Sequence, residues 1–356
     1  MKTETGVAND SRAPNICPLV AIVTPVYNGE PWLTRTLASV QAQTYPNLVH
    51  VVLDNASTDD TSSVIAAACG KRVPIITRRN PSLLSQVDNW NAAIALTPAQ
   101  AQYVKLLCAD DIIRADCIER LVAVAESDPG LDFVTAVDTY GGQVKPHGLD
   151  ANQSVYDGRE VMLRLLRGEI AWFPFHHLFF RVTPERLNKP FDTATFPAAD
   201  ADFVFGVLRE AKMGFVNAPL FYTRVHEKSQ TTGMGGDFYF LYTSLQRLDR
   251  FAGGLMSGGN IARSRLRIHR QILRHVIAWK ALGQTALAKE HIARLASTGY
   301  APDAIEYLIA ILTWPYHKLR ITIKRLQDRS GSLPKLTEAE FLSGAPDDRA
   351  PRLVSN

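Results

Sequence analysis

The sequence predicts an α/β protein in which a mostly parallel central sheet is flanked by helices and followed by a helical C-terminal extension. From residue 18 to about residue 137, short apolar segments alternate with longer stretches of helical periodicity, which is the pattern of successive βαβ units. Three apolar segments end in polar, turn-forming residues, so three strand ends should meet at one edge of the sheet. Beyond Phe238, apolar residues recur at helical spacing among many Arg and Lys residues.

The elements are expected in the following order. Apolar strands lie within residues 21–29, 49–55 and 103–108, and helices cover residues 32–43, 61–69, 87–96 and 116–126. The pattern then loosens, with a helix at 158–167, a helix opened by the acidic residues at 200 and 202, and a strand at 215–223. Two further helical stretches cover residues 261–282 and 305–326.

The chain length predicts one large domain with an appendage, because 356 residues exceed what a single core usually supports. We expect the main domain at residues 18–236, with a nucleotide-binding half at 18–137 and an acceptor half at 138–236. A helical region at 237–329 follows. Residues 1–17 and 330–356 are expected to be flexible tails.

Composition excludes some classes of protein. A net charge of +4 on 356 residues is too small to indicate nucleic-acid binding, although it suits an anionic ligand or membrane surface. Four cysteines without a CxxC pair indicate neither disulfides nor structural zinc. Because no segment is apolar enough to cross a membrane, we expect a cytoplasmic protein. The stretch 305–326 either packs on the main domain with a basic face in solvent, the favoured interpretation, or lies at the inner face of the plasma membrane.

Asp110 and Asp111 directly follow the apolar run at 103–108. Carboxylates at the carboxyl end of a strand can hold a divalent cation against a diphosphate. Consecutive strand residues face opposite ways, so only one of the two is expected to be a ligand. The alternative is that the pair caps a following helix.

Other polar residues extend the candidate site. Tyr27 offers a flat ring near the first strand end, and Asp54 can accept a hydrogen bond from a pyrimidine imide, although it can also simply cap a turn. Arg224 and His226 alternate along an extended segment and can face one crevice. Glycines at 233, 235 and 236 suggest a lid after this segment.

Five motifs in one order resemble those of family 2 glycosyltransferases, which have the GT-A fold. They are Thr24-Pro25-Val26-Tyr27-Asn28, the segment 54–59, Asp110-Asp111, Asp200-Ala201-Asp202 and Arg224-Val225-His226. The resemblance covers about residues 18–236. It implies transfer of a sugar, with inversion, from a nucleoside-diphosphate sugar to an acceptor hydroxyl, with Mg²⁺ or Mn²⁺ as cofactor.

The resemblance also assigns roles to individual residues. It implies nucleotide contacts for Thr24, Pro25, Tyr27, Asn28, Asp54, Asn91 and Arg224, and metal contacts for Asp110, Asp111 and His226. It makes Asp200 the base. Asp202, in the same motif, and Trp172 and His177, whose rings can stack on sugar faces, are the candidates for acceptor binding. Asn91 is explained almost as well by a helix cap, and the aromatic residues equally well by core packing.

The expected donor is a UDP-sugar and the acceptor a glycan or a lipid-linked glycan, in cell-surface polysaccharide or glycolipid synthesis. Cys108 and Ala199 stand where the family usually has acids, so a binding or scaffold protein that has lost activity is the alternative. A nucleotide-dependent dehydrogenase is disfavoured, because no GxGxxG follows the first strand.

Overall fold

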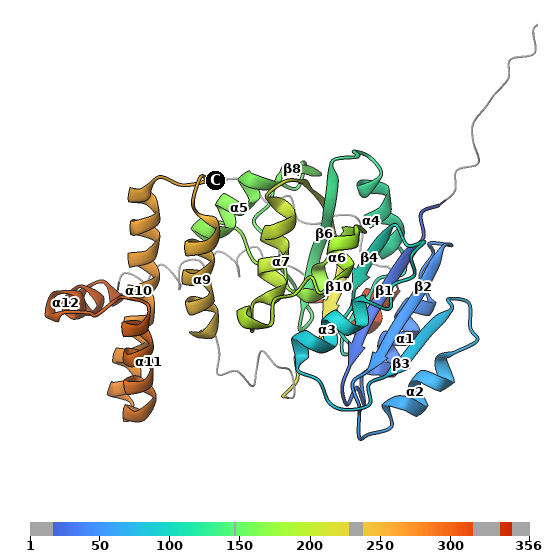
Figure 1. Cartoon of the computed structure of the whole chain (residues 1–356), viewed down its shortest axis with the longest axis horizontal. Helices are drawn as coiled ribbons and strands as arrows, with labels where there is room; N and C mark the ends of the chain where they lie inside the picture. Colours follow the sequence, from blue (N-terminus) through green and yellow to red (C-terminus); the bar gives the residue numbers. More distant parts are fainter. Residues whose placement is uncertain (1–16, 146, 228–237, 316–334, 344–356) are drawn as a thin grey trace, which may run out of the picture.

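The computed structural model describes residues 17–145, 147–227, 238–315 and 335–343, and these contain one ten-stranded sheet flanked by helices (Figure 1). The strand order is β3-β2-β1-β4-β9-β6-β10-β5, with β7 beside β6 and β8 beside β10. The strands are β1 (Val20–Val26), β2 (Leu48–Asp54), β3 (Ile75–Arg79), β4 (Tyr103–Leu106), β5 (Ile112–Ile113), β6 (Leu131–Tyr140), β7 (Gln143–Lys145), β8 (Val155–Asp157), β9 (Phe179–Arg181) and β10 (Lys212–Thr223).

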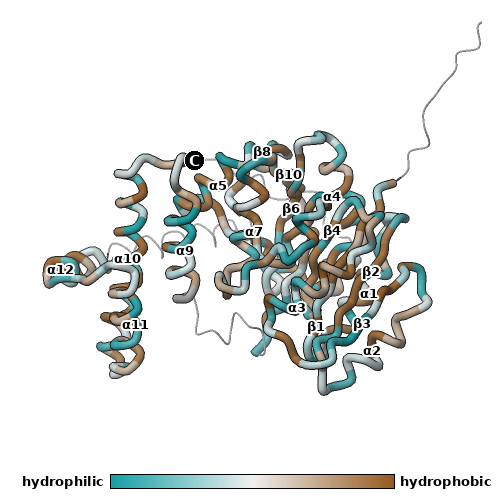
Figure 2. The backbone as a smooth tube through the Cα atoms, in the orientation of Figure 1, coloured by the Kyte–Doolittle hydropathy of each residue, from teal (hydrophilic) through white to brown (hydrophobic). Residues whose placement is uncertain are grey.

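The first half of the sheet is parallel, as the alternating pattern predicts. β1 lies between β2 and β4, and β3 pairs with β2, all in the same direction. Strands β1, β2 and β4 are buried and mostly apolar (Figure 2), as expected for a parallel sheet covered on both faces. Val26 pairs with Asp54 in the register, so the carboxyl ends of β1 and β2 lie side by side.

The second half is mixed. β9 runs antiparallel between β4 and β6, whereas β10 runs parallel to β6. β5 pairs antiparallel with β10 directly after the Asp110–Asp111 turn. Because β10 ends at Thr223, this pairing brings Arg224 to the same edge as the acidic pair. The α/β fold class is confirmed.

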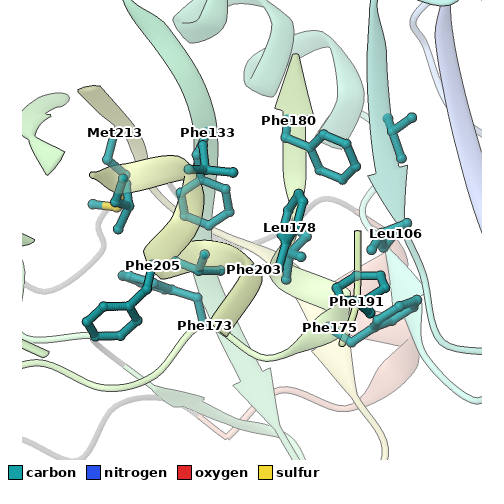
Figure 3. Close-up of a cluster of buried hydrophobic side chains, with 14 of the residues drawn as sticks. Leu106, Phe133, Phe173, Phe175, Leu178, Phe180, Phe191, Phe203, Phe205 and Met213 are labelled. Atoms are coloured by element: carbon teal, nitrogen blue, oxygen red, sulfur yellow. The ribbon is translucent and has the colours of Figure 1, made fainter. Parts of the chain in front are cut away.

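Helices cover both faces of the sheet. They are α1 (Leu33–Gln41), α2 (Thr61–Ala68), α3 (Gln86–Ile94), α4 (Cys117–Ala125), α5 (Gly158–Arg167), α6 (Pro184–Leu187) and α7 (Ala199–Leu208), with short 3₁₀ helices η1 (Phe175–His177) and η2 (Thr193–Thr195). Buried residues of α3, α5 and α7 share one apolar cluster with β6 and β9. Figure 3 shows Phe203 and Phe205 of α7 in this cluster, near Phe133 of β6.

The C-terminal helices lie beyond α5 and α7, at one end of the molecule (Figure 1). They are α9 (Phe238–Phe251), α10 (Gly258–Ala281), α11 (Thr285–Ser297) and α12 (Ala304–Leu312). α9 contacts both α5 and α10, and α10 contacts α11 and α12. Among the described residues, no helix is long and apolar enough to cross a membrane.

The expectation of a flexible tail at 330–356 is wrong for residues 335–343. Leu336 donates its amide to the Gly142 carbonyl at 2.7 Å, and α14 (Glu338–Leu342) follows. Phe341 is 1% exposed, and its ring lies 5.3 Å from that of Tyr222. Burial of this ring and of Leu336 explains why the segment docks.

Gly142 is required for this docking. Its φ is +85°, and a Cβ there would lie 2.8 Å from the Leu336 carbonyl oxygen, so a larger residue would be strained and would block the approach. The expected lid at 233–236, the tail before residue 17 and the stretch 316–329 lie outside the described residues. The boundaries expected at 236 and 329 stay predictions.

Candidate active site

The turn after β1 is tied to the turn after β2. Asn28 adopts a left-handed conformation with φ 49°, which Asn tolerates better than most residues. Its amide donates to Ser57 Oγ at 2.9 Å, and its Oδ1 accepts from the Thr58 amide at 2.8 Å. The neighbouring Tyr27 remains 48% exposed. The two strand ends therefore form one rigid rim with an aromatic ring open to a ligand.

Asp54 is buried at the end of β2. One carboxylate oxygen accepts from the Ser57 amide at 2.8 Å, and the other accepts from Ser62 Oγ at 2.7 Å and from Arg79. Burial alone would raise the pKa of Asp54, but these hydrogen bonds outweigh it and lower the pKa. Asp54 is therefore an ionised acceptor that caps a turn, and its contact with a nucleotide stays a prediction.

Arg79 is a residue that the sequence patterns did not single out. It lies at the end of β3 and pairs with the Asp54 carboxylate, while half of its side chain stays exposed. The signal was weak, because β3 is short and exposed and ends in two arginines. Arg79 adds cationic donors to the rim that Tyr27 and Asp54 form.

Three residues expected at the nucleotide lie differently. Thr24 is fully buried and its Oγ1 is 2.9 Å from His50 Nε2 inside the sheet, because alternate side chains of β1 face the core. Pro25 is partly buried within β1. Asn91 exchanges two hydrogen bonds with the Phe191 backbone, at 2.8 and 3.0 Å. Both side chains are therefore engaged with protein partners, and nucleotide contacts by Thr24, Pro25 and Asn91 stay predictions.

The side chains of Asp110 and Asp111 diverge. Asp110 is partly exposed, with its Oδ2 3.0 Å from His226 Nε2. Asp111 is buried, where its Oδ1 accepts from the Arg224 amide at 3.1 Å and its Oδ2 lies 3.5 Å from His176 Nδ1. Burial raises the pKa of Asp111 to about 7. Asp110 and His226 are therefore the pair open to a cation, and Asp111 is turned inward.

Arg224 is held on both sides. Its Nη1 donates to the Asp110 carbonyl at 2.6 Å. Its Nε and Nη2 donate to the Glu338 carboxylate at 3.0 and 2.7 Å, and Arg35 reaches the same carboxylate at 3.2 Å. The buried guanidinium is therefore bidentate to a carboxylate, and its contact with the nucleotide stays a prediction.

Glu338 is thus a second site residue that the sequence patterns missed. It stands in a segment expected to be flexible, and only the Thr337-x-x-Glu340 capping box signalled a helix there. Through Arg224, α14 fixes the turn that carries Asp110. The C-terminal segment therefore contributes Glu338 to the candidate site.

His226 is oriented by Trp32. Their rings are stacked with centroids 5.2 Å apart, and the Arg224 guanidinium lies over the same indole at 5.4 Å from its centroid. Such stacking fixes the imidazole plane. Trp32 immediately precedes α1. The start of this helix therefore places the indole against His226, whose Nε2 lies 3.0 Å from Asp110.

A buried polar cluster lies beneath the acidic pair. Thr223 Oγ1 is 3.0 Å from both oxygens of Asp138 and 2.8 Å from His176 Nε2. Burial disfavours a charged His176, but Asp111 and Asp138 outweigh it and raise its pKa. His176 therefore bridges the acidic turn to β6 and β10.

His177 lies in the same cluster. It is 1% exposed, and its Nδ1 is 3.3 Å from Thr135 Oγ1. Burial lowers its pKa well below the usual range. η1 turns this ring into the core, and a contact of His177 with the acceptor stays a prediction.

Two groups of described residues bring possible metal donors within 4.8 Å of one another: Cys108, Asp111 and His176, and Asp138, His176 and His177. The hydrogen bonds above already connect His176 and Asp138 to protein partners. Asp110 and His226 add a more open pair of oxygen and nitrogen donors. A carboxylate oxygen suits Mn²⁺ or Mg²⁺ at a diphosphate, and the imidazole adds a nitrogen donor.

Asp200 lies in the first turn of α7. Its Oδ2 accepts from the Phe175 amide at 2.9 Å and its Oδ1 from the Ala201 amide at 2.7 Å. Burial raises the pKa of Asp200. His176 follows Phe175 directly and lies 3.5 Å from Asp111. η1 therefore contacts both Asp200 and the Asp110–Asp111 turn.

Asp202 and Trp172 lie near the same helix. Asp202 is paired with the half-exposed Arg250 at 2.9 Å. The partly buried Trp172 packs against Phe205, with ring centroids 5.8 Å apart, and carries the Arg247 guanidinium 4.0 Å above its ring. These contacts are mainly with the protein, so acceptor binding by Trp172 and Asp202 stays a prediction.

Comparison with known proteins agrees with this geometry. Residues 21–185 match the family model for glycosyl transferase family 2. The chain is 32% identical over 126 residues to an uncharacterized glycosyltransferase of Haemophilus influenzae, covering 35% of this chain and 37% of that protein. It is 27% identical over 204 residues to uncharacterized glycosyltransferase EpsJ of Bacillus subtilis, covering 55% and 57%. Both matches span less than two thirds of the relative's length.

Solved structures share the fold. S. aureus TarS in complex with UDP-GlcNAc aligns with a TM-score of 0.55 at 14% identity, over 70% of this chain and 71% of that chain. Mannosyltransferase PcManGT from Pyrobaculum calidifontis, in complex with GDP-Man and Mn²⁺, aligns with a TM-score of 0.53 at 18% identity, over 86% and 84%. The fold is thus that of the GT-A glycosyltransferases. Within that class, the match of residues 21–185 supports glycosyl transferase family 2.

Proposed function

We propose that this protein transfers a sugar, with inversion, from a nucleoside-diphosphate sugar to an acceptor hydroxyl. The observation that carries the proposal is the separation of two sites by η1. We assign the Asp110 and His226 pair to the nucleotide side; Asp200 accepts from the Phe175 amide, and the next residue, His176, lies 3.5 Å from Asp111. Direct displacement needs this arrangement, with one group at the leaving diphosphate and a distant carboxylate at the acceptor.

The rim of the first two strands is the proposed nucleotide site. Tyr27 offers an exposed ring for the base, and the ionised Asp54 can accept from an imide N–H while the exposed part of Arg79 donates. A uracil has this pattern of donor and acceptors, which makes a UDP-sugar the first choice. The relatives in solved complexes hold UDP-GlcNAc or GDP-Man, so a GDP-sugar is the second.

Asp110 and His226 would hold Mg²⁺ or Mn²⁺. When bound there, the ion supplies positive charge to the departing diphosphate. The residues fit this role because a carboxylate and an oriented imidazole converge at 3.0 Å. Mn²⁺ accompanies GDP-Man in the Pyrobaculum calidifontis enzyme.

Asp200 is the proposed base. It takes the proton of the acceptor hydroxyl as that oxygen bonds to the anomeric carbon, and the bond to the nucleoside diphosphate breaks on the opposite face. The hydrogen bonds from Phe175 and Ala201 fix the carboxylate, and burial raises its pKa toward the range useful for a base. Asp202 is paired with Arg250 and is the weaker candidate.

A glycan or lipid-linked acceptor, used in building a surface polysaccharide or glycolipid, completes the proposal. α12 exposes four large apolar side chains, Ile305, Leu308, Ile311 and Leu312. Such a helix suits the inner face of the plasma membrane, where a lipid-linked acceptor would lie. Flotation of the full chain with liposomes tests this part, with Leu308→Glu and Leu312→Glu expected to abolish co-flotation.

Donor hydrolysis tests the central proposal. Wild-type protein incubated with UDP-GlcNAc or GDP-mannose should release nucleoside diphosphate slowly and only with Mn²⁺, and Asp110→Ala should abolish the release. The alternative is a scaffold that keeps the fold without activity, prompted by Cys108 and Ala199. Nucleotide binding without release from a panel of common donors would favour the scaffold.

A further inference from the structure

Three buried side chains meet beneath the Asp110–Asp111 turn. Asp138, on β6, is 6% exposed, and His176 and His177, both on η1, are 7% and 1% exposed. Each offers one donor atom, and these atoms all lie within 4.8 Å of one another. One carboxylate with two imidazoles is a ligand set that divalent transition metals accept in proteins, zinc in particular.

The distances within this cluster suit a shared metal ion better than direct hydrogen bonds. His176 Nε2 lies 3.6 Å and His177 Nε2 lies 3.7 Å from Asp138 Oδ2, which is too long for a hydrogen bond. Ligand atoms about 2.0–2.2 Å from a tetrahedral zinc ion stand roughly 3.3–3.6 Å apart. Among the described residues, His177 Nε2 has no hydrogen-bond partner, although protein encloses it. This ring therefore holds an unused nitrogen near the carboxylate.

The other nitrogen of each ring has an oxygen atom beside it. For Nε2 to bind a metal, the ring proton must be on Nδ1. His176 Nδ1 lies 3.5 Å from Asp111 Oδ2, and His177 Nδ1 lies 3.3 Å from Thr135 Oγ1. Histidines that bind metals usually have such an oxygen behind the ring, which fixes the tautomer and the ring plane. The cluster thus contains both the ligands and the groups that orient them.

Thr223, at the end of β10, adds a hydroxyl to the cluster. Its Oγ1 is 3.0 Å from both oxygens of Asp138 and 2.8 Å from His176 Nε2. A hydroxyl donates only one proton, so Thr223 can donate to the carboxylate while the His176 nitrogen binds a cation. Three protein ligands leave one tetrahedral position for a water molecule or the Thr223 oxygen.

We propose that Asp138, His176 and His177 form a buried structural site for a Zn²⁺ ion. The site is separate from the more open pair of Asp110 and His226. It does not depend on the proposed transfer of a sugar. Positive charge from the ion compensates the burial of the Asp138 carboxylate, which is otherwise costly.

The place of this site in the fold gives the ion a structural role. η1 also includes Phe175, whose amide donates to Asp200 at 2.9 Å. The ion ties η1 to β6, and through His176 it lies next to the buried Asp111. It therefore stabilises the segment that contacts both Asp200 and the acidic turn.

The test measures metal in protein without an affinity tag, purified without added metal. Elemental analysis should find about one zinc ion per chain in wild type after dialysis. Asp110→Asn, which removes a ligand of the open pair, should contain as much. His177→Gln and Asp138→Asn should contain little or none. His50→Gln is the matched control, because His50 is also buried but pairs with Thr24 inside the parallel sheet.

Stability gives a second readout that does not require the ligand variants to fold. Zinc is removed from Asp110→Asn with a strong chelator, and Zn²⁺ or Co²⁺ is then added back. Near 100 times its Kd, Zn²⁺ should raise the Tm by roughly 5 °C, and Co²⁺ should give the visible absorption bands of a tetrahedral ion.

Two results would overturn the inference. One is a wild-type protein that contains no zinc and gains no stability from added Zn²⁺. The other is zinc that persists in both His177→Gln and Asp138→Asn. If zinc binds as expected but UDP-GlcNAc and GDP-mannose are never hydrolysed, the buried site stands and the proposed function fails.

Discussion

Asp110 and Asp111 are neighbours in the chain with different environments. Asp110 is open and faces His226, whereas Asp111 is buried against His176 and the Arg224 amide. Alternation along an extended chain predicts that one of two consecutive carboxylates faces a ligand. It does not predict which one, because that depends on contacts with β10 and η1.

The first prediction separates these two residues. Asp110→Asn should remove Mn²⁺-dependent nucleotide binding and leave the free protein nearly as stable as wild type, because the Asp110 side chain is only partly buried. Asp111→Asn should lower the free energy of unfolding by about 1–3 kcal/mol, since it disturbs a buried hydrogen-bond network. Thermal melts with and without nucleotide and Mn²⁺ measure both effects. Equal loss of stability in the two variants would contradict the assignment.

The second prediction concerns the base. Asp200→Asn should slow transfer by about 10²–10⁴-fold, because general base catalysis is lost, while nucleotide affinity stays unchanged. Asp202→Asn, two positions along the same helix, is the control and should retain most of the activity. Steady-state rates and calorimetric titration with nucleotide give the two quantities. Near-normal turnover by the Asp200 variant would remove it from the mechanism.

The sequence predicted which candidate residues stand at strand ends, but it did not predict partners from distant segments. Tyr27 and Asp110 follow strands and Asp54 ends one, as expected. The Asn91 amide pairs with the Phe191 backbone, 100 positions away. No local sequence pattern indicates such a contact.

At the scale of elements, α14 shows how a short segment can control a site. It has five residues, yet Phe341 is buried and Glu338 holds Arg224 by two hydrogen bonds. A helix this short is unstable alone, so tertiary packing maintains it. Sequence periodicity cannot detect five residues, which is why this element was expected to be a tail.

The third prediction tests the docking of α14. Phe341→Ala removes a buried ring worth about 3–5 kcal/mol, so the segment should undock. Hydrogen exchange should then become fast at residues 336–342, including the Leu336 amide that bonds to Gly142. Glu340→Gln is the control, because Gln also completes a capping box. Unchanged protection in Phe341→Ala would show that the ring does not hold the segment.

The fourth prediction concerns Glu338 itself. Glu338→Gln should lower stability by about 1–3 kcal/mol, because the buried Arg224 loses its charged partner. It should also weaken Mn²⁺-dependent nucleotide binding, since Arg224 fixes the Asp110 turn. Chemical denaturation and nucleotide titration measure the two effects. Wild-type values for both would contradict a role for α14 in the site.

At the scale of the whole molecule, buried histidines contribute to the loss of stability in acid. His50 lies inside the parallel sheet beside Thr24, and burial lowers its pKa to about 3. The unfolded chain takes up a proton below about pH 6.5, while the folded protein does not until about pH 3. Stability from this residue is therefore complete above pH 6.5 and is lost as pH falls through that window.

The fifth prediction follows from the direction of this pH dependence. When the pH falls from 7.5 to 5.0, wild type should lose about 2 kcal/mol of unfolding free energy because of His50. The loss over the same interval should be about 2 kcal/mol smaller in His50→Gln. Other buried histidines, such as His147, titrate in both proteins and cancel in the comparison. Urea denaturation of both proteins at the two pH values measures these losses. Equal losses of unfolding free energy in wild type and His50→Gln would contradict the prediction.

The parallel half of the fold was predictable because its strands are continuous apolar runs separated by amphipathic helices. The mixed half was not, since β9 pairs with β4 and β6 only after a long excursion of the chain. The helices α9 and α10 were expected from periodicity, but the contact of Arg247 with Trp172 depends on tertiary packing.

The most direct measurement is a thermal-shift panel of UDP, GDP, dTDP and CMP, each with and without Mn²⁺, on wild type and Asp110→Asn. A nucleotide near 100 times its Kd should add about 2.7 kcal/mol of stability. We expect a manganese-dependent shift of the melting temperature with one nucleoside diphosphate, with UDP as the first choice. This shift should be lost in Asp110→Asn. No shift with any nucleotide, or a shift that survives Asp110→Asn, would contradict the proposed donor site.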